Sequence, residues 1–218
     1  MAPFRLAPRS VGATRSLGPV ETAALVPIKG FHAAKARLAP VLGQADRERL
    51  ARWMATRVIR AFGPIPTFVA CDDERVAAWA EELGAGVLWG PGLGLNGAID
   101  VGVDTLAGKG IDHVVIAHGD LPRPDALAAV AVAGTIVLVP DRRRDGTNVI
   151  ARPTSARLPA EYGAGSFDRH LTTALAANVP VQVRSDPYLS IDVDTIDDCR
   201  HPIAAAVLRP FLGDRMPM

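Results

Sequence analysis

The sequence is poor in cysteine, has no excess of either charge and lacks a long apolar run. Cys71 and Cys199 are the only two cysteines and lie far apart, which excludes a disulfide framework and zinc-finger spacing and suits a reducing compartment. The 24 Lys and Arg residues nearly balance 23 Asp and Glu residues, so no overall field attracts nucleic acid or an anionic membrane. No apolar run reaches the roughly 18 to 20 residues of a membrane span. These absences predict a cytoplasmic protein with neither a nucleic-acid nor a membrane partner.

The chain also lacks internal repeats and a Pro/Gly-rich interdomain linker. Residues 1–22 carry three arginines with no acid before Glu21, but they have no continuous apolar stretch of the kind found in a secretory signal. We therefore expect 1–22 to be a loose N-terminal extension. At 218 residues and 49% hydrophobic composition, the remaining 23–218 suit one domain with a substantial core.

Short β-rich runs alternate with helical patterns along this domain. Strands are expected at 24–28, 67–71, 86–89, 113–117, 135–140, 147–151 and 181–184. Helices are expected at 45–62, 73–83, 96–106, 125–132, 167–177 and 195–207. The nearly continuous apolar strands suit a sheet covered on both faces, which predicts an α/β fold with a mostly parallel, doubly wound sheet. Ligands of such folds bind beyond the carboxyl ends of the strands.

Three cations follow the first expected strand. Lys29, Lys35 and Arg37 come after Val26-Pro27-Ile28 and before a proline break. Cations just beyond a strand end can neutralise a polyphosphate. For this segment taken alone, a solvated basic turn is the favoured interpretation.

Asp120 is the best single candidate for a site residue. It follows a buried strand in His118-Gly119-Asp120-Leu121-Pro122, where a hard cation and its phosphate could meet. The alternative is a turn or cap role for Asp120. For His118 we favour a structural role over direct chemistry.

A second acidic motif, Asp192-Val193-Asp194, lies near the C-terminus. In an extended segment the two carboxylates point to the same side, and like charges placed together favour a cation between them. The motif is a plausible Mg²⁺ site with Asp120 as third ligand. A competing interpretation makes Asp194 the N-cap of the next helix, with Asp197 and Asp198 in its first turn.

A glycine-rich loop precedes the third expected helix. Gly92, Gly94 and Gly97 satisfy the dinucleotide pattern G-x-G-x-x-G, but the pattern normally belongs to the first strand and helix of its fold. We favour binding of a purine base and ribose, with the Asn96 amide contributing recognition.

Two further segments complete the candidate residues. Arg142–Arg144 lead into Thr147 and Asn148, and Gly163-Ala164-Gly165-Ser166 leads into a helix. A helix start with a serine hydroxyl is a potential anion site, although the local sequence alone favours an ordinary capping serine with a hairpin before it.

Taken in order, these motifs resemble those of the 2-phospho-L-lactate or phosphoenolpyruvate guanylyltransferases of deazaflavin coenzyme biosynthesis. The resemblance covers about residues 23 to 205. The motifs are Val26-Pro27-Ile28-Lys29, Lys35-x-Arg37-Leu38, Gly94-Leu95-Asn96, Gly119-Asp120-Leu121-Pro122, Gly146-Thr147-Asn148, Gly163-x-Gly165-Ser166-Phe167 and Asp192-Val193-Asp194-Thr195.

The resemblance implies a nucleotide-diphospho-sugar-transferase type of fold, GTP as donor, Mg²⁺ as cofactor, and pyrophosphate and a guanylylated phospho-acid as products. It is compatible with a homodimer that passes its product to the next biosynthetic enzyme. The implied roles group into four sets. Lys29, Lys35 and Arg37 bind the triphosphate, Gly94 and Asn96 the guanosine, Thr147, Gly163 and Ser166 the acid, and Asp120, Asp192 and Asp194 the metal; Lys29, Lys35 and Asp120 carry the catalysis.

The expected reaction is attack by a substrate phosphate oxygen on the α-phosphorus of GTP. Phosphoenolpyruvate, 2-phospholactate and 3-phosphoglycerate all stay open as acceptors. Two features depart from the family pattern. His118 stands where a small residue is expected, and Arg142–Arg144 form a more basic run than expected. Either could alter which acid is accepted.

Two rival functions remain. A molybdopterin guanylyl- or cytidylyltransferase would share the fold and metal chemistry, but its glycine-rich first loop is replaced here by Val26-Pro27-Ile28-Lys29. A non-catalytic nucleotide sensor built on Gly92–Gly97 would bind nucleotide and release no pyrophosphate. A serine hydrolase is disfavoured because no G-x-S-x-G elbow is present.

Overall fold

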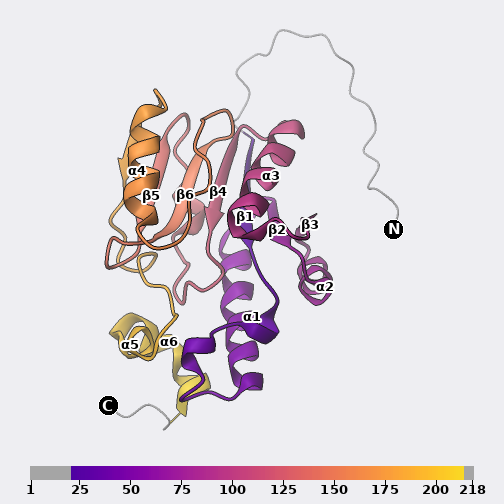
Figure 1. The fold of residues 1–218 in the computed structure, drawn as a ribbon, viewed down its shortest axis with the longest axis vertical. Coiled ribbons are helices and arrows are strands. Elements are labelled where there is room, and N and C mark those ends of the chain that lie inside the picture. The colour runs from indigo at the N-terminus through magenta and orange to yellow at the C-terminus, as the bar shows by residue number, and fades with distance from the viewer. Residues whose placement is uncertain (1–20, 214–218) are drawn as a thin grey trace.

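A seven-stranded sheet lies at the centre of the computed structural model, which describes residues 21–213 (Figure 1). The strand order is β3-β2-β1-β4-β6-β5-β7. The strands are β1 (Thr22–Pro27), β2 (Thr67–Cys71), β3 (Gly86–Trp89), β4 (His113–Ala117), β5 (Ile136–Pro140), β6 (Thr147–Pro153) and β7 (Val181–Val183). Only β6 runs antiparallel to its neighbours, β4 and β5, while the remaining paired strands are parallel.

Helices cover both faces of this sheet. They are α1 (Gln44–Ala61), α2 (Glu74–Glu82), α3 (Gly94–Gly108), α4 (Ser166–Ala176), α5 (Ile196–Arg200) and α6 (Pro202–Leu212), with 3-10 turns η1 (Phe31–Ala33), η2 (Ala36–Leu38) and η3 (Leu127–Ala129). Ala24 and Val26 of β1 pack in one cluster with α1 and α2, whereas Ala23 and Leu25 pack in another with α3 and α4. Alternate side chains of one strand thus serve two cores, as a doubly wound layer architecture requires.

A third core cluster joins the first half of α1 to the C-terminal helices. Leu38, Leu50 and Met54 pack there against Val193 and Leu208. Figure 1 shows α5 and α6 beside the lower end of α1, below the sheet. This cluster fixes the segment after β7 against the loop that follows β1.

The predicted α/β fold with a mostly parallel, doubly wound sheet is confirmed, and the seven expected strands are found with small shifts at their ends. Two helix predictions were wrong. Residues 125–132 form only the short turn η3, and the expected helix 195–207 is split into α5 and α6. Pro202 opens α6, because proline has no N–H for the helix interior but suits the first helical position.

The expected loose extension, 1–22, lies almost wholly outside the described residues, and β1 already begins at Thr22. The bounds of the single domain therefore stay a prediction. Both cysteines, Cys71 and Cys199, are buried and free. Within 21–213, no helix is long and apolar enough to span a membrane.

The strand order reverses direction between β1 and β4. From β1 the chain proceeds outward to β2 and β3, and it then returns to place β4 on the other side of β1. In open α/β sheets, ligands bind at such a switch point beyond the carboxyl ends of the strands. The loops that follow β1 and β4 begin at this point.

Candidate active site

Lys35 joins the two acidic motifs that the sequence placed far apart. Its Nζ donates to Asp120 Oδ2 at 2.7 Å and to Asp194 Oδ1 at 2.8 Å. The Lys35 side chain is only 8% exposed, so these charges interact with little screening by solvent. Three of the predicted site residues therefore meet at the switch point of the sheet.

The loop after β1 holds Lys35 in an uncommon conformation. Lys35 has φ 56° and ψ 38°, in the left-handed region, between the turns η1 and η2. Phe31 anchors one side of the loop by an edge-on contact with Trp79, with ring centroids 5.0 Å apart, and Leu38 is buried on the other side. Backbone strain of this kind concentrates at functional sites, where the surrounding packing maintains it.

A backbone hydrogen bond holds the Asp192–Asp194 segment beside Asp120. The Val193 amide donates to the Asp120 carbonyl oxygen at 3.3 Å. Ile191 and Val193 are buried in the third cluster, and the intervening carboxylates are only partly buried. The expected alternation is present, although the segment pairs with no strand of the sheet.

The N-cap of the following helix is Thr195, so the competing assignment of that role to Asp194 was wrong. Thr195 and Asp198 form a reciprocal capping box at the start of α5. Asp198 also accepts a hydrogen bond from the Asp194 amide at 3.2 Å. The cap therefore orients the Asp194 backbone and leaves its carboxylate for Lys35.

The charges of this cluster perturb one another. Burial acts to lower the pKa of Lys35, but the carboxylates of Asp120 and Asp194 outweigh burial and raise it, so Lys35 is a permanent cation. Burial acts to raise the pKa of Asp120, but Lys35 outweighs it and lowers that pKa. The pKa of Asp192 is raised to about 7 by burial and by repulsion from Asp120 and Asp194. Asp120 and Asp194 share the Lys35 ammonium, and the Asp192 carboxyl group lies near both, so the cluster holds more acidic than basic groups.

This donor set suits a hard divalent cation. Asp120 Oδ1 is buried and has no hydrogen-bond partner among the described residues. The raised pKa of Asp192 shows that its ionised form lacks a nearby positive charge to stabilise it. Carboxylate oxygens are the ligands that Mg²⁺ prefers. Across 21–213, however, no three His, Cys, Asp or Glu side chains already converge as a metal site, because Lys35 lies between Asp120 and Asp194. The metal roles of Asp120, Asp192 and Asp194 stay a prediction.

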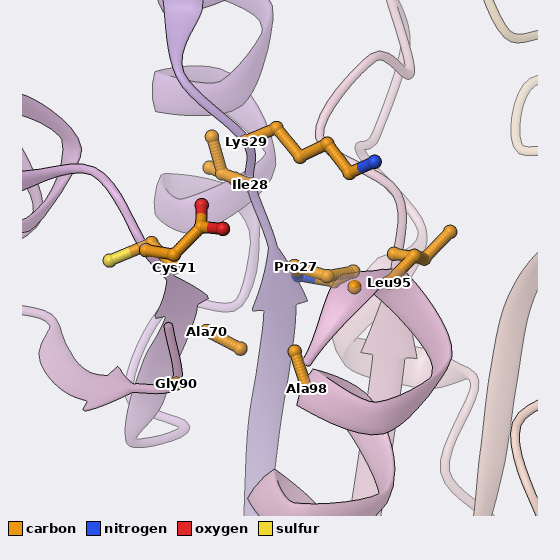
Figure 2. A pocket seen from close by; sticks show the side chains of 10 residues that line it. Pro27, Ile28, Lys29, Ala70, Cys71, Gly90, Leu95 and Ala98 are labelled. Carbon is orange, nitrogen blue, oxygen red and sulfur yellow. The ribbon is translucent and has the colours of Figure 1, made fainter. Parts of the chain in front are cut away.

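A pocket opens at the carboxyl ends of β1, β2 and β3, next to the first turn of α3 (Figure 2). Lys29 and Gly94, two of the predicted nucleotide ligands, both line it. Figure 2 shows the Lys29 side chain extending from the end of β1 toward the side of the pocket where Leu95 lies. Gly94 has φ 67°, a conformation that glycine adopts without strain. Arg37 is exposed and is not among the residues that line this pocket.

The Asn96 side chain bonds to the backbone of Tyr162. Its Oδ1 accepts from the Tyr162 amide at 2.9 Å, and its Nδ2 donates to the Tyr162 carbonyl oxygen at 3.3 Å. The Asn96 amide thus ties α3 to the turn before α4. Its contact with guanosine stays a prediction. The Asn96 Nδ2 group has a second hydrogen, which could make that contact.

The three residues predicted to bind the acid lie around the start of α4. Phe167 N donates to the Asp145 carbonyl oxygen at 3.1 Å, which joins α4 to the loop that leads into Thr147. Ser166 is buried, and its amide donates to the Gly163 carbonyl oxygen at 3.0 Å. In this structure the Ser166 amide is therefore already paired, and the hydroxyl is the group left for the predicted substrate contact.

Two residues near this turn were missed at the sequence level. His170 lies one helical turn after Ser166 and bonds through Nδ1 to Thr147 Oγ1 at 3.0 Å. Tyr162 packs between His118 and His170, with ring centroids 4.9 and 4.8 Å away. The four-residue spacing of Ser166 and His170 on one helix was the available signal. The structural role favoured for His118 agrees with this packing.

The basic run Arg142–Arg144 is engaged within the protein. Arg142 Nη2 lies 2.7 Å from Asp198 Oδ1, and Arg143 Nη2 lies 3.4 Å from the same oxygen. The Arg144 guanidinium lies over the Phe167 ring, 4.7 Å from its centroid. The run holds the β5–β6 loop against the starts of α5 and α4.

Several known proteins are similar to this chain in sequence or in fold. A family model described as "Guanylyl transferase CofC like" matches residues 22–203. A phosphoenolpyruvate guanylyltransferase from Sphaerobacter thermophilus is 35% identical over 187 residues, covering 81% of this chain and 90% of the relative. A 2-phospho-L-lactate guanylyltransferase from Methanothermobacter thermautotrophicus is 32% identical, covering 82% of each chain.

Solved structures agree at the level of the fold. A putative nucleotide-diphospho-sugar transferase from Desulfovibrio desulfuricans superimposes with a TM-score of 0.65 at 18% identity, covering 88% of this chain and 99% of the other. The nucleotide-diphospho-sugar-transferase-like fold is thereby confirmed. The sequence match and the fold together show that this chain belongs to the guanylyl transferase CofC-like family and is a nucleotidyltransferase.

Proposed function

We propose that this protein transfers GMP from GTP to a small phosphorylated acid and releases pyrophosphate, with Mg²⁺ as cofactor, in deazaflavin coenzyme biosynthesis. The observation that carries the proposal is the contact of Lys35 with both Asp120 and Asp194 at the switch point of the sheet. In this contact a permanent cation meets two carboxylates, and Lys29, from the same loop after β1 as Lys35, lines the pocket at the ends of β1 and β2. Polyphosphate chemistry requires this combination of charges.

The chemistry needs no strong general base. A phosphate monoester is largely ionised at neutral pH, so its oxygen can attack the α-phosphorus directly. The new P–O bond forms as the bond to the β-phosphate oxygen breaks, and pyrophosphate leaves with the electron pair. Catalysis then depends on positioning and on neutralising charge.

Lys29 and Lys35 neutralise the triphosphate in this proposal. Lys29 is exposed at the pocket and free to reach the β- and γ-phosphates, while Lys35 is held rigidly beside Asp120. Gly94 admits the nucleotide close to the backbone at the start of α3. Arg37 and Asn96 keep their proposed nucleotide-binding roles, although neither lines this pocket.

Asp120, Asp192 and Asp194 hold the metal ion in this proposal. The unpartnered Asp120 Oδ1 and the charge repulsion around Asp192 support the assignment. When bound, Mg²⁺ would stabilise negative charge at the reacting phosphates.

Thr147, Gly163 and Ser166 grip the acid substrate through hydroxyl and backbone groups at the start of α4. Phosphoenolpyruvate is the first acid to test, because the relative with the higher identity of the two described carries that name. The family membership favours these acids over a molybdopterin substrate and favours an enzyme over a nucleotide sensor. A cytoplasmic location, a homodimer and transfer of the product to the next enzyme remain parts of the same proposal.

Pyrophosphate release tests the proposal. The purified protein is supplied with GTP, ATP or CTP and with phosphoenolpyruvate, 2-phospholactate or 3-phosphoglycerate, each with and without Mg²⁺. We expect turnover with GTP and one preferred acid only when Mg²⁺ is present. Equal turnover with ATP or CTP would contradict the guanylyl assignment, and nucleotide binding without pyrophosphate release under any condition would favour a sensor.

A further inference from the structure

His170 and Thr147 form the last link of a buried hydrogen-bond chain that begins at the backbone. The Glu161 amide donates to His170 Nε2 at 3.0 Å, and His170 Nδ1 lies 3.0 Å from Thr147 Oγ1. His170 is 0% exposed and Thr147 3% exposed, so water does not compete for these bonds. The chain therefore fixes the direction of each hydrogen bond within it.

The first bond determines the tautomer of the histidine. A backbone N–H only donates, so Nε2 must accept and carry no proton. Burial lowers the pKa of His170 to about 4, which keeps the ring neutral near pH 7. The single ring proton then lies on Nδ1 and is donated to Thr147 Oγ1.

This direction releases the hydroxyl hydrogen of Thr147. An oxygen that already accepts from His170 directs its own hydrogen elsewhere, and no acceptor for it is found among residues 21–213. Phe167 N and Gly165 N both bond to Asp145, which holds the start of α4 beside the loop that leads into Thr147. The free hydrogen thus belongs to a residue next to the turn that carries Ser166.

We propose that His170 is a positioning residue that orients the Thr147 hydroxyl as a hydrogen-bond donor to the anionic group of the phospho-acid. The inference rests on the proposed function, because the acid is the acceptor in that reaction. His170 does not touch the substrate or exchange a proton with it. Tyr162, packed edge-on against the His170 ring, limits its rotation and so keeps Nδ1 aimed at Thr147.

The tautomer can be observed without turnover. In ¹⁵N-histidine-labelled protein, two-dimensional ¹⁵N–¹H correlation distinguishes Nδ1–H from Nε2–H rings, and His170→Phe assigns the signal among the five histidines. We expect the Nδ1–H form for His170. A signal from an Nε2–H ring would overturn the proposal.

Kinetics then test the consequence for the acid. His170→Phe keeps a planar ring and removes both hydrogen bonds, and we expect KM for the acid to rise roughly 3- to 10-fold, the loss of one hydrogen bond, with kcat and KM for GTP nearly unchanged. His170→Asn places an amide near the Nδ1 position and should restore most of the affinity. Thr147→Val should match His170→Phe, and the double variant should be no worse than Thr147→Val alone.

Thermal unfolding of each variant separates these outcomes from misfolding, and Thr147→Ser, which keeps a hydroxyl, serves as a second conservative variant. If KM for GTP and the acid rise together in His170→Phe, or if the two single effects add, His170 is only a structural residue. If the wild-type protein releases no pyrophosphate with any acid, the proposed function fails instead.

Discussion

The carbonyl oxygen of Asp120 accepts a hydrogen bond from the amide of Val193, with 3.3 Å between the two atoms. This bond joins the loop after β4 to a segment more than seventy residues later in the sequence, and it places Asp192 and Asp194 on either side of the contact. Lys35 closes the same group from the loop after β1. The functions proposed for these residues depend on this convergence.

Asp120→Asn is expected to reduce the rate of pyrophosphate release by roughly 100-fold or more, since it removes the charge of the central carboxylate while keeping its shape. The circular dichroism spectrum should not change. Asp197→Asn is the matched control, because Asp197 lies in the same region, its side chain is 76% exposed, and among the described residues its one ion pair is with Arg200. Near-normal activity of Asp120→Asn with Mg²⁺ would remove Asp120 from the proposed metal site.

Lys35→Met should destabilise the protein and abolish turnover. It leaves Asp120 and Asp194 without their shared cation, and we expect a loss of about 1–3 kcal/mol in the free energy of unfolding, discounted for the partial exposure of Asp194. Urea unfolding measures this loss. Lys109, the exposed C-cap of α3, lies over the Phe68 ring with its Nζ 5.4 Å from the ring centroid, so Lys109→Ala should keep activity and lose less stability than Lys35→Met. Equal effects of the two substitutions would contradict the role given to Lys35.

Asn96→Ala distinguishes the structural from the recognition role of this residue. Because Asn96 holds both backbone groups of Tyr162 and is proposed to bind the nucleotide, its loss should destabilise the protein by about 1–2 kcal/mol and raise KM for the acid as well as for GTP. A role in binding guanosine alone predicts a rise in KM for GTP with unchanged stability. Steady-state kinetics with each substrate varied in turn decide between them.

The contribution of His170 to the free energy of unfolding should fall as the pH is lowered from about 6.5 to about 4. Its pKa is lowered to about 4 in the folded protein by burial, and the unfolded chain therefore binds the proton first as pH falls. This residue contributes full stability above its unfolded pKa and loses it at about 1.4 kcal/mol per pH unit through the window. Asp192, with its raised pKa, and His113 and His118, with lowered pKa values, add their own slopes to both proteins. The His170 slope is therefore the difference between the pH profiles of urea unfolding of the wild type and of His170→Asn.

Much of the fold and part of the site could be predicted from the sequence. Near-continuous apolar runs located the seven strands, and the position of Asp120 after a buried strand placed it at the ligand-binding edge. The alternation of Ile191 and Val193 with the two aspartates indicated which side chains turn away from the core. These features are local, so the sequence carries them directly.

The remaining features depend on long-range partners. The antiparallel direction of β6 is set by its pairing with β4 and β5, which no local pattern records. The hydrogen bond between Asn96 and the Tyr162 backbone and the ion pair between Arg142 and Asp198 form only when segments distant in sequence fold together. Thr195 and not Asp194 is the N-cap of α5, because Asp198 lies three residues after Thr195 and completes a capping box with it.

Binding of Mn²⁺, a spectroscopic substitute for Mg²⁺, tests most directly whether the three carboxylates form one metal site. Electron paramagnetic resonance titrations with GTP present would compare the wild type with Asp120→Asn, Asp192→Asn, Asp194→Asn and the control Asp197→Asn. We predict that each of the first three substitutions weakens Mn²⁺ binding at least roughly tenfold and that the control leaves it unchanged. Mn²⁺ binding of wild-type strength in all of these variants would contradict the metal site.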